Sequence, residues 1–356
     1  MVEPTRTPIR VGHCCTCENA DTCTNAGGDH QKGSRLKSRG HRPSDPPASV
    51  RANPLAFSLS RQREHAGVHK PKQGASSSKK PCAQSDRVRQ DLIDRGFARF
   101  EREFLNTSPG DRLALLHIRQ IAQAMPLDRD AKGHGRARLY GRATKLAHDG
   151  ERYTLHYHRG RHYEHFDRTG LEYTQPACVN SEAAGERRLF GAFPEELYLN
   201  HLVERWVRQL FDLLPIGNDE RREEWRVGLH LLRLEPDAEH PATASPNRVR
   251  RDGEPFTAAV LIDRIGVEGG INAITHVRWH DHARENVPSS DLFSEFTLEN
   301  PFEGYIVADE RVAHYVGPVC RQNAGMDGNR TVLLIDFTRL GPILNLAGIE
   351  ATEGTT

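Results

Sequence analysis

Three residues in the last third of the chain have the types and the order of an iron site. Asp252 lies in the run Arg250-Arg251-Asp252-Gly253, His314 lies in a later strand-like segment, and Arg330 opens a further one. A carboxylate and an imidazole on separate strands are ligands of mononuclear non-haem iron, where two histidines and one carboxylate leave positions for O₂ and a co-substrate. Arg250 stands at the position where that pattern has its first histidine.

Each of these residues also has an ordinary structural explanation. Asp252-Gly253 is a common turn dipeptide between strands, and the valines on either side of His314 are typical of a structural histidine in a strand. Arg330 alone would be a surface residue that leads into a strand. The iron interpretation therefore rests on the three residues occurring together and in this order.

The residue at the missing ligand position limits the iron hypothesis. A guanidinium is always protonated and has no lone pair to give to a metal. Either Arg250 turns away and another donor takes the position, or it pairs with Asp252 and the site holds no metal. Two imidazoles are candidates for the third ligand. They are His230, on the preceding strand-like segment, and His280, in the run 274–282, which is otherwise a solvated loop.

Composition and charge exclude several classes of protein. The 356 residues carry 49 Lys and Arg against 48 Asp and Glu, so the formal net charge of +1 gives no sign of a polyanion partner. No apolar run approaches the roughly 18–20 residues of a membrane helix, and the first residues lack the apolar core of a signal peptide. We therefore expect a cytoplasmic protein that acts on a small molecule, with no membrane or nucleic-acid partner.

The first 85 residues differ from the rest. Pro, Ser, Gly, Arg and Lys dominate them, and such a segment cannot bury enough apolar surface to offset the entropy of ordering. We expect residues 1–85 to be a disordered basic tail. Nuclear targeting, nucleic-acid contact or a processed transit segment are alternatives. Cys14, Cys17, Cys23 and His30 have the ligand types of a structural zinc site, but their spacing matches no common zinc finger.

Ordered structure is predicted from Asp86 to residue 345 as a single domain, and residues 346–356 are again predicted to be disordered. The part from 86 to 224 has helical and mixed patterns. Its helix-like segments are Val88 to Phe100 with an interruption at Gly96, Asp111 to Met125, and Glu195 to Leu214.

The apolar period changes to two at Trp225, so residues 225–340 are predicted to be the β-rich core of the domain. Its strand-like runs are Val227 to Leu234, Phe256 to Ile262, Tyr305 to Ala308 and Val332 to Phe337. Helices first and strands later predict an α+β domain whose second half is a jelly-roll-like β-sandwich, with the N-terminal helices packed against it.

Short motifs along this region occur in the order of one known family. The family strand Val-Gly-x-His-x-x-Arg is matched by residues 227–233, and the element His-Arg-Asp-Gly-x-x-Phe by residues 250–256, with Arg250 in place of the histidine. Two later elements are echoed by residues 263–270 and 309–318. Further matches upstream are Tyr173-Thr174-Gln175, Asn180, Arg188 and Phe190. From residue 90 to 340 the chain thus resembles the 2-oxoglutarate/Fe(II) dioxygenase family that includes L-isoleucine 4-hydroxylase.

The resemblance implies a double-stranded β-helix of cupin type that uses Fe(II) and 2-oxoglutarate. It implies that Asp252 and His314 are iron ligands. It also implies that Arg330 pairs with the distal carboxylate of 2-oxoglutarate, a role suited to a bidentate guanidinium. The implied substrate is a free amino acid, oxidised while 2-oxoglutarate is converted to succinate and CO₂. The chain departs from the family at Arg250, and at Ile271-Asn272, where relatives often carry Glu and a hydroxyl residue.

Two functions of different class therefore remain open from the sequence. The first is a 2-oxoglutarate-dependent oxygenase whose iron site is altered or completed by another imidazole. The second is a catalytically silent fold that binds a small acid or a partner protein. Metal binding would discriminate between them.

Overall fold

The computed structural model describes residues 80–105, 108, 110–128, 134–147, 153–175, 179, 185–244, 247–323 and 325–341. These residues belong to one compact unit within residues 73–356. The predicted tail up to residue 79 lies outside the described residues, as do the Cys14 to His30 cluster, Asn180 and the predicted C-terminal segment.

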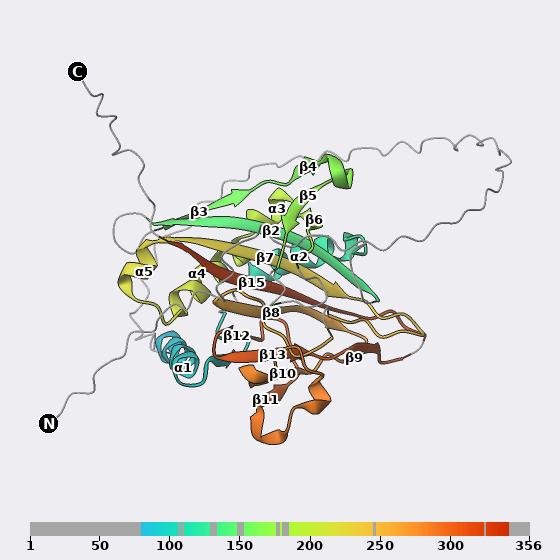
Figure 1. Cartoon of the computed structure of the whole chain (residues 1–356). Helices are drawn as coiled ribbons and strands as arrows, with labels where there is room; N and C mark the ends of the chain where they lie inside the picture. Colours follow the sequence, from blue (N-terminus) through green and yellow to red (C-terminus); the bar gives the residue numbers. More distant parts are fainter. Residues whose placement is uncertain are drawn as a thin grey trace, which may run out of the picture. The chain divides into compact units, whose positions relative to one another are not determined.

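Ten strands form the large sheet at the centre of the unit (Figure 1). Its order is β1-β12-β8-β15-β7-β2-β6-β5-β4, and β3 pairs with β2. The pairing of β2 with β6 is parallel, whereas the other neighbouring strands of this sheet are antiparallel. The strands are β1 (Phe97–Phe100), β2 (Arg136–Ala147), β3 (Tyr153–His158), β4 (Arg161–Tyr163), β5 (Arg168–Tyr173), β6 (Arg188–Ala192), β7 (Glu224–Leu234), β8 (Phe256–Ile265), β12 (Gly304–Ala308) and β15 (Asn329–Gly341).

A small sheet faces the large one and completes the barrel-like core. It has the order β11-β10-β13, and a separate pair joins β14 to β9. These strands are β9 (Val267–Gly269), β10 (Asn272–His276), β11 (Leu292–Phe296), β13 (Val312–Val316) and β14 (Val319–Arg321). Ile274 and Phe296 from the small sheet pack with Tyr305 and Val332 from the large one in a single apolar cluster. The predicted α+β fold with a jelly-roll or cupin-like core is confirmed.

The other face of the large sheet is covered by helices (Figure 1). Trp206 and Phe211 of α4 are buried against strand residues such as Trp225 and Phe337 in the largest apolar cluster. The helices are α1 (Lys80–Arg95), α2 (Asp111–Ala124), α3 (Glu195–Tyr198), α4 (His201–Leu213) and α5 (Asn218–Arg222), with 3-10 turns η1 (Glu164–Phe166), η3 (Val277–Trp279), η4 (Arg284–Asn286) and η5 (Ser289–Asp291). The small sheet and the helices thus lie on opposite faces of the large sheet, which leaves the space between the two sheets for a site.

The predicted helix from Glu195 to Leu214 is wrong at one point, because it is interrupted at Leu199 and Asn200. The Asn200 side chain accepts a hydrogen bond from the Leu202 amide (3.0 Å) and donates one to the Ala114 carbonyl (3.0 Å). In a continuous helix the Leu202 amide would donate to the carbonyl four residues earlier. Here the Asn200 side chain accepts that hydrogen bond instead, and so caps a new helix. Leu199, predicted on the buried stripe, is 75% exposed as a result.

Two predicted boundaries in the first half also differ from the structure. The helix α1 begins at Lys80, six residues before the expected start of order, and ends at Arg95. Gly96 has φ +78, and the chain then continues as β1 at the edge of the large sheet rather than as helix. The predicted border at residue 225, between a helical and mixed part and the β-rich core, does not divide the sheet, because β2 pairs with β7 along ten residues.

A buried carboxylate joins α2 to α4. Asp111 accepts hydrogen bonds from Arg205 Nη2 (2.9 Å), His201 Nε2 (2.9 Å) and the Ser108 amide (2.6 Å), and its side chain is only 2% exposed. Burial alone would raise the pKa of Asp111, but the hydrogen bonds from Arg205, Ser108 and His201 outweigh it and hold the pKa well below its usual range.

We predict that Asp111→Asn lowers the free energy of unfolding by about 1–3 kcal/mol, because a buried charged partner of Arg205 is lost. The folded-state pKa of Asp111 lies below the unfolded value, so this contribution is present above about pH 4 and disappears as the pH falls further. Urea unfolding at pH 7 and pH 3 measures both effects. The exposed Asp219→Asn is the matched control, and an equal loss at the two pH values would contradict the assignment.

Candidate functional site

Two backbone hydrogen bonds fix the loop that carries Asp252. The Arg250 amide donates to the His314 carbonyl (2.7 Å), and the His314 amide donates to the Arg250 carbonyl (2.9 Å). This isolated antiparallel bridge joins the loop before β8 to the middle of β13. Residues 250 and 314 are therefore directly opposite each other. Asp252, two positions after Arg250, has its side chain on the same side of the backbone as Arg250.

The Asp252 loop is held from its other side by a buried carboxylate. Asp309 accepts hydrogen bonds from the Asp252 amide and from the Gly253 amide, each at 2.9 Å. Its side chain is 2% exposed, and burial and the nearby Asp252 raise its pKa to about 7 although Arg251 lies 3.5 Å away. Both oxygens of one carboxylate are thus used to hold two successive amides, which fixes the direction in which the Asp252 side chain leaves the backbone.

The side chains of Asp252, His314 and Arg250 converge between the two sheets. The Asp252 carboxylate lies 3.4 Å from His314 Nε2 and 3.7 Å from Arg250 Nε. Burial lowers the pKa of His314 to about 4, so the imidazole is neutral at pH 7 and keeps a lone pair on one nitrogen. Burial opposes ionisation of Asp252, yet His314 and Arg250 hold its pKa below the usual value.

Arg330 opens onto the same cavity and has no carboxylate partner among the described residues. It is 2% exposed, and its Nε makes no hydrogen bond there. Burial lowers the pKa of Arg330 to about 10, which still leaves it charged at neutral pH. Gly270 makes room for it, because a β-carbon at this residue would lie 3.1 Å from Arg330 Cδ, and its φ of +65 disfavours other residues. Tyr305 also lines the cavity.

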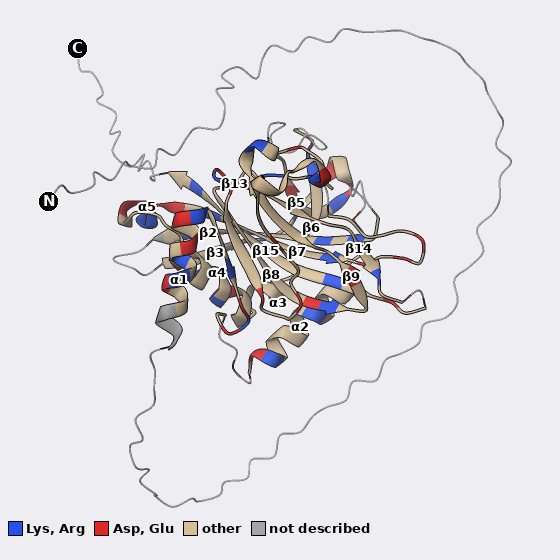
Figure 2. Ribbon diagram, turned by 90° about the horizontal axis from the view of Figure 1, so that it is seen from below, with Lys and Arg blue, Asp and Glu red and all other residues tan. Residues whose placement is uncertain are grey.

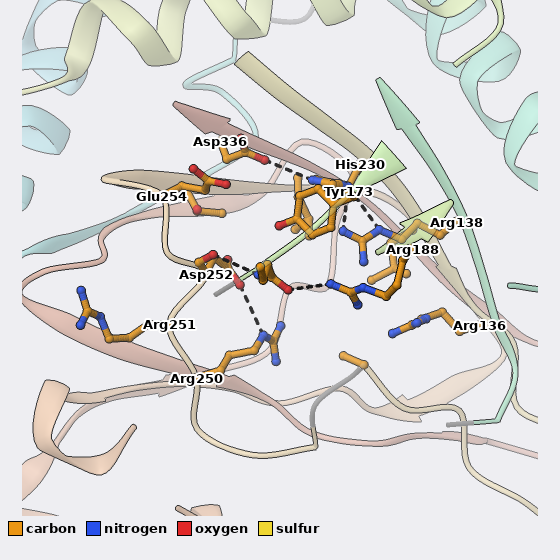
Figure 3. Close-up of a pocket in the computed structure, with 15 residues that line it drawn as sticks. Arg136, Arg138, Tyr173, Arg188, His230, Arg250, Arg251, Asp252, Glu254 and Asp336 are labelled. Atoms are coloured by element: carbon orange, nitrogen blue, oxygen red, sulfur yellow. Dashed lines mark hydrogen bonds and ion pairs between the residues drawn. The ribbon is translucent and has the colours of Figure 1, made fainter. Parts of the chain in front are cut away.

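A second cavity adjoins the first, and Arg250 and Asp252 line both. Figure 3 shows its two sides. Carboxylates lie on one side, namely Glu254 and Asp336 with Asp252 below them. Arg138, Arg188 and Arg136 lie on the opposite side, and Arg250 and Arg251 lie below Asp252.

His230 stands between these two sides. Arg138 donates from Nε (3.2 Å) and Nη2 (2.8 Å) to His230 Nδ1, and His230 Nε2 lies 3.2 Å from the Asp336 carboxylate. Burial and the charge of Arg138 lower the pKa of His230 well below its usual value, so the ring is neutral and its Nε2 proton points to Asp336. Asp336 lies directly over Gly228, where a β-carbon would come within 2.3 Å of its oxygen.

The carboxylates of this cavity are hard to ionise. Burial raises the pKa of Asp336 to about 6 and the pKa of Glu254 to about 7. Asp336 accepts from the Gly228 amide (3.1 Å), and Glu254 pairs with Arg226 (3.3 Å) and accepts from the Thr338 hydroxyl. A cationic ligand group would favour the charged form of both.

The structure brings together three of the residues singled out in the sequence, Asp252, His314 and Arg330, and places Arg250 beside them. The two candidates for a third ligand have other partners: His230 is hydrogen-bonded to Arg138, and His280 Nε2 lies 2.9 Å from the Val179 carbonyl. Within the described residues, no group of three His, Cys, Asp or Glu side chains is arranged to hold a metal.

Sequence analysis gave no role to Arg138, Glu254 or Asp336. A signal existed for Asp336, because it is the one charged residue in the apolar run 332–337, and a charge buried in a strand is rarely without a partner. Arg138 and Glu254 carry no comparable local signal. Their convergence depends on strand register, which pairs residues far apart in the chain.

The model of the 2OG-Fe dioxygenase family matches residues 119–336, and the chain belongs to this family. Family and fold together indicate a 2-oxoglutarate-dependent dioxygenase, and the family uses Fe(II) and 2-oxoglutarate. No curated protein sequence matches the chain significantly.

Solved structures share the fold at low sequence identity. One is a bsmA homolog from Methylobium petroleophilum PM1, with a TM-score of 0.58, 20% identity and coverage of 72% of this chain and 95% of that one. Another is IDO from Bacillus thuringiensis, with a TM-score of 0.52, 18% identity and coverage of 72% and 99%. A third is the Fe(II)/(alpha)ketoglutarate-dependent dioxygenase TqaL, with a TM-score of 0.52, 13% identity and coverage of 72% and 87%. At these identities the likeness concerns the fold.

The residues present fit an iron ion in part. Asp252 supplies an ionised carboxylate and His314 a neutral imidazole, and the two face each other across 3.4 Å. Arg330 adds a buried guanidinium to the same cavity. Arg250 lies beside them and is a cation, which cannot donate to a metal. Of these four residues, only Asp252 and His314 carry atoms that could donate to an iron ion.

The rest of the described surface adds two findings. Basic and acidic residues are interspersed over the elements (Figure 2). None of the helices in the described residues is long and apolar enough to cross a membrane.

We predict that Asp309→Asn loosens the Asp252 loop, because an amide cannot accept with both of its polar atoms. The free energy of unfolding should fall by about 1–3 kcal/mol, since Arg251 also loses its counter-charge. Hydrogen exchange at the Asp252 and Gly253 amides should become faster, which measures the local effect. The exposed neighbour Glu310→Gln is the control, and unchanged exchange at both amides in Asp309→Asn would contradict this role.

Proposed function

We propose that this dioxygenase hydroxylates a free amino acid or a similar small polar molecule, with 2-oxoglutarate as co-substrate. One observation supports the proposal most directly. The cavity that holds Asp252, His314 and Arg330 adjoins a second cavity whose buried lining carries charges of both signs. A small charged substrate in the second cavity would therefore lie next to a co-substrate in the first.

In this proposal Asp252 and His314 hold Fe(II), and Arg330 pairs with the distal carboxylate of 2-oxoglutarate. Arg330 suits this role because its guanidinium is buried without a carboxylate partner among the described residues, and burying such a charge is costly unless an anion joins it. Iron and 2-oxoglutarate together supply the activation of O₂. Each hydroxyl group formed consumes one O₂ and one 2-oxoglutarate, and releases one succinate and one CO₂.

The third ligand position belongs to the same proposal. Two protein donors hold iron more weakly than three, and 2-oxoglutarate adds two further donors when it binds. Completion by His230 or His280 would require each ring to leave its present partner, Arg138 or Val179. We therefore propose that iron binding depends on 2-oxoglutarate more strongly than it would at a site with three ligands.

A second candidate function is a fold that binds a small acid without catalysis. The pairing of Arg250 with Asp252 at 3.7 Å favours it, because the guanidinium already balances the carboxylate that a metal would use. Anaerobic titration with Co(II), followed by its visible absorption bands, separates the two candidates. Bands that appear only with 2-oxoglutarate support the oxygenase, and no bands under either condition support the silent fold.

Succinate release tests the oxygenase directly. The full chain with Fe(II), 2-oxoglutarate and O₂ should release succinate faster when a pool of free amino acids is added. Mass spectrometry should then find one amino acid that has gained an oxygen atom. If iron is bound and no amino acid raises succinate release, the substrate class is wrong.

We predict that Arg330→Leu weakens 2-oxoglutarate binding by about 2–5 kcal/mol, because a charged pair in a buried cavity is broken. Calorimetry with 2-oxoglutarate measures the change. Arg321→Leu is the matched control, since Arg321 pairs with the exposed Asp327 and lies outside both cavities. Equal affinity in Arg330→Leu and the native chain would remove Arg330 from the co-substrate site.

We predict that Arg250→His strengthens Fe(II) binding and raises turnover of 2-oxoglutarate. A guanidinium about 4 Å from a divalent ion repels it by roughly 8 kcal/mol at an effective dielectric of 20, whereas an imidazole donates to it. Anaerobic Fe(II) or Co(II) titration measures the affinity, with Arg248→His as control because Arg248 is exposed and pairs with Asp281.

Two results would change this interpretation. Native protein that binds Fe(II) tightly, and loses it when His230 or His280 is replaced, would establish a triad completed by that residue. Arg250→His protein that folds normally and still binds no metal would mean that Asp252 and His314 do not form an iron site, and the oxygenase proposal would fail with them.

A further inference from the structure

A groove of about 310 Å³ lies between α1, β1 and β11. β1 is an end strand of the large sheet and β11 an end strand of the small one, and Figure 1 shows α1 beside the small sheet. The groove shares no lining residue with the cavity of Asp252 and His314 or with the second cavity. A ligand in this groove would therefore be neither the co-substrate nor the substrate of the proposed function.

Arginines from two elements line this groove, and aromatic rings hold two of them. Arg95 Cζ lies 4.2 Å from the centre of the Phe97 ring, and Arg99 Cζ lies 4.2 Å from the centre of the Phe296 ring. Phe97 and Arg99 are two positions apart in β1 and face the same side, so both guanidiniums lie on one side of this strand. Stacking on a ring orients a guanidinium without using its N–H groups, which remain available for hydrogen bonds.

The positive charge of the lining is only partly balanced. Arg87 of α1 is a third guanidinium in the groove, and among the described residues neither Arg87 nor Arg99 has an ion-pair partner. Arg95 reaches Asp91 at 3.9 Å, with side chains that are 49% and 31% exposed, and so long and open a pair stabilises little. Asp91 and Glu101 are the acidic residues of the lining, so three positive charges face two negative ones.

The two stacked arginines also have a structural explanation. Each covers a ring at the edge of the apolar cluster between the sheets, where Phe97 is 2% exposed and Phe296 is 7% exposed. Covering these rings does not require Arg87, a third guanidinium in the same groove. It does not require a hollow beside the rings either. The cations and the hollow together are therefore better explained by an anionic ligand.

The chemistry of the lining favours a phosphate group over a single carboxylate. Oriented guanidiniums bind phosphate oxygens through two parallel hydrogen bonds each. A phosphate monoester carries about −1.5 to −2 charges at neutral pH and has three acceptor oxygens, enough for more than one arginine. The Ser294 hydroxyl of β11 adds a neutral donor from the small sheet. The volume of the groove is at the lower end of the range for small-molecule pockets, roughly 300–1,000 Å³.

We propose that the groove between α1, β1 and β11 binds a phosphate group, free or as the ester of a small molecule, through Arg95 and Arg99. Arg87 adds to the positive field. Asp91 competes with the phosphate for Arg95, and a bound phosphate replaces it as the partner of this guanidinium. The site goes beyond the proposed function and does not depend on it.

The test uses the native full-length chain and requires no catalysis. Inorganic phosphate, pyrophosphate and glycerol phosphate are titrated by calorimetry at low ionic strength, with uncharged glycerol as the control ligand. At least one of the three anions should bind one-to-one with a dissociation constant below about 1 mM, and added salt should weaken it because the guanidiniums are partly exposed. Tightest binding of the ester would identify a phosphorylated small molecule, and tightest binding of either inorganic anion would identify free phosphate.

Variants with effects of opposite sign locate the anion. Arg95→Gln and Arg99→Gln should each weaken the best anion by about five- to tenfold, because each removes a charge-assisted contact. Asp91→Asn should strengthen it by about two- to fivefold, because the competing carboxylate is gone. A merely structural role of these residues would not produce tighter binding in any variant. If Arg95→Gln does not fold, Arg87→Gln tests the same helix.

Matched controls change the same residue types outside the groove. Arg112→Gln on α2 and Asp94→Asn on α1 are exposed substitutions and should leave the affinity for the anion unchanged. The groove variants should also leave the affinity for 2-oxoglutarate unchanged, since the two sites share no residue.

Three results would overturn the proposal. One is the lack of saturable binding by any of the three anions. Another is equal affinity of the native chain, Arg99→Gln and Asp91→Asn. The third is loss of binding in Arg330→Leu but not in Arg99→Gln, which would place the anion in the co-substrate cavity instead.

Discussion

The site depends on the backbone pairing of Arg250 with His314. This single antiparallel bridge brings a loop that precedes β8 to a strand more than sixty residues later, and it sets which side chains share a cavity. A shift of one residue would turn His314 away from the space between the sheets, because successive strand residues face opposite sides. Asp309 also fixes the orientation of the Asp252 loop, because its carboxylate accepts hydrogen bonds from the amides of Asp252 and Gly253.

Charge burial is the second constraint, and it explains why this interior is not simply apolar. Asp336 and Arg330 are buried and Asp252 is half-buried between the sheets, and the cost of removing such groups from water is recovered only with partners. Some partners are internal, as with His230 and Asp336. Arg330 and Arg188 have no carboxylate partner among the described residues. Such incompletely paired groups mark where ligands are expected to bind.

The sequence predicts the β core because the four apolar runs expected to be strands form β7, β8, β12 and β15, although these strands are buried almost continuously rather than on alternate residues. It cannot predict the break at Asn200, since that depends on a hydrogen bond to Ala114, in another helix. The same limit applies to the site. Short motifs point to Asp252 and His314, whereas the placement of Arg138 and Asp336 on either side of His230 follows from β2 and β15 both pairing with β7. No local sequence pattern specifies the register of three paired strands.

Arg250 lies between the candidate metal site and the second cavity, because it lines both cavities. Its Nε faces Asp252 at 3.7 Å while its Nη1 is buried without a hydrogen-bond partner. A metal bound at Asp252 would repel the Arg250 guanidinium. An anionic ligand on the side of Arg250 away from Asp252 would attract the guanidinium, so both would displace it in the same direction. A ligand that favours the displaced Arg250 would therefore strengthen metal binding, and a bound metal would strengthen binding of that ligand by the same factor. If Asp252 holds the metal as proposed, Arg250 would couple metal and substrate affinities, beyond removing one ligand from the family pattern.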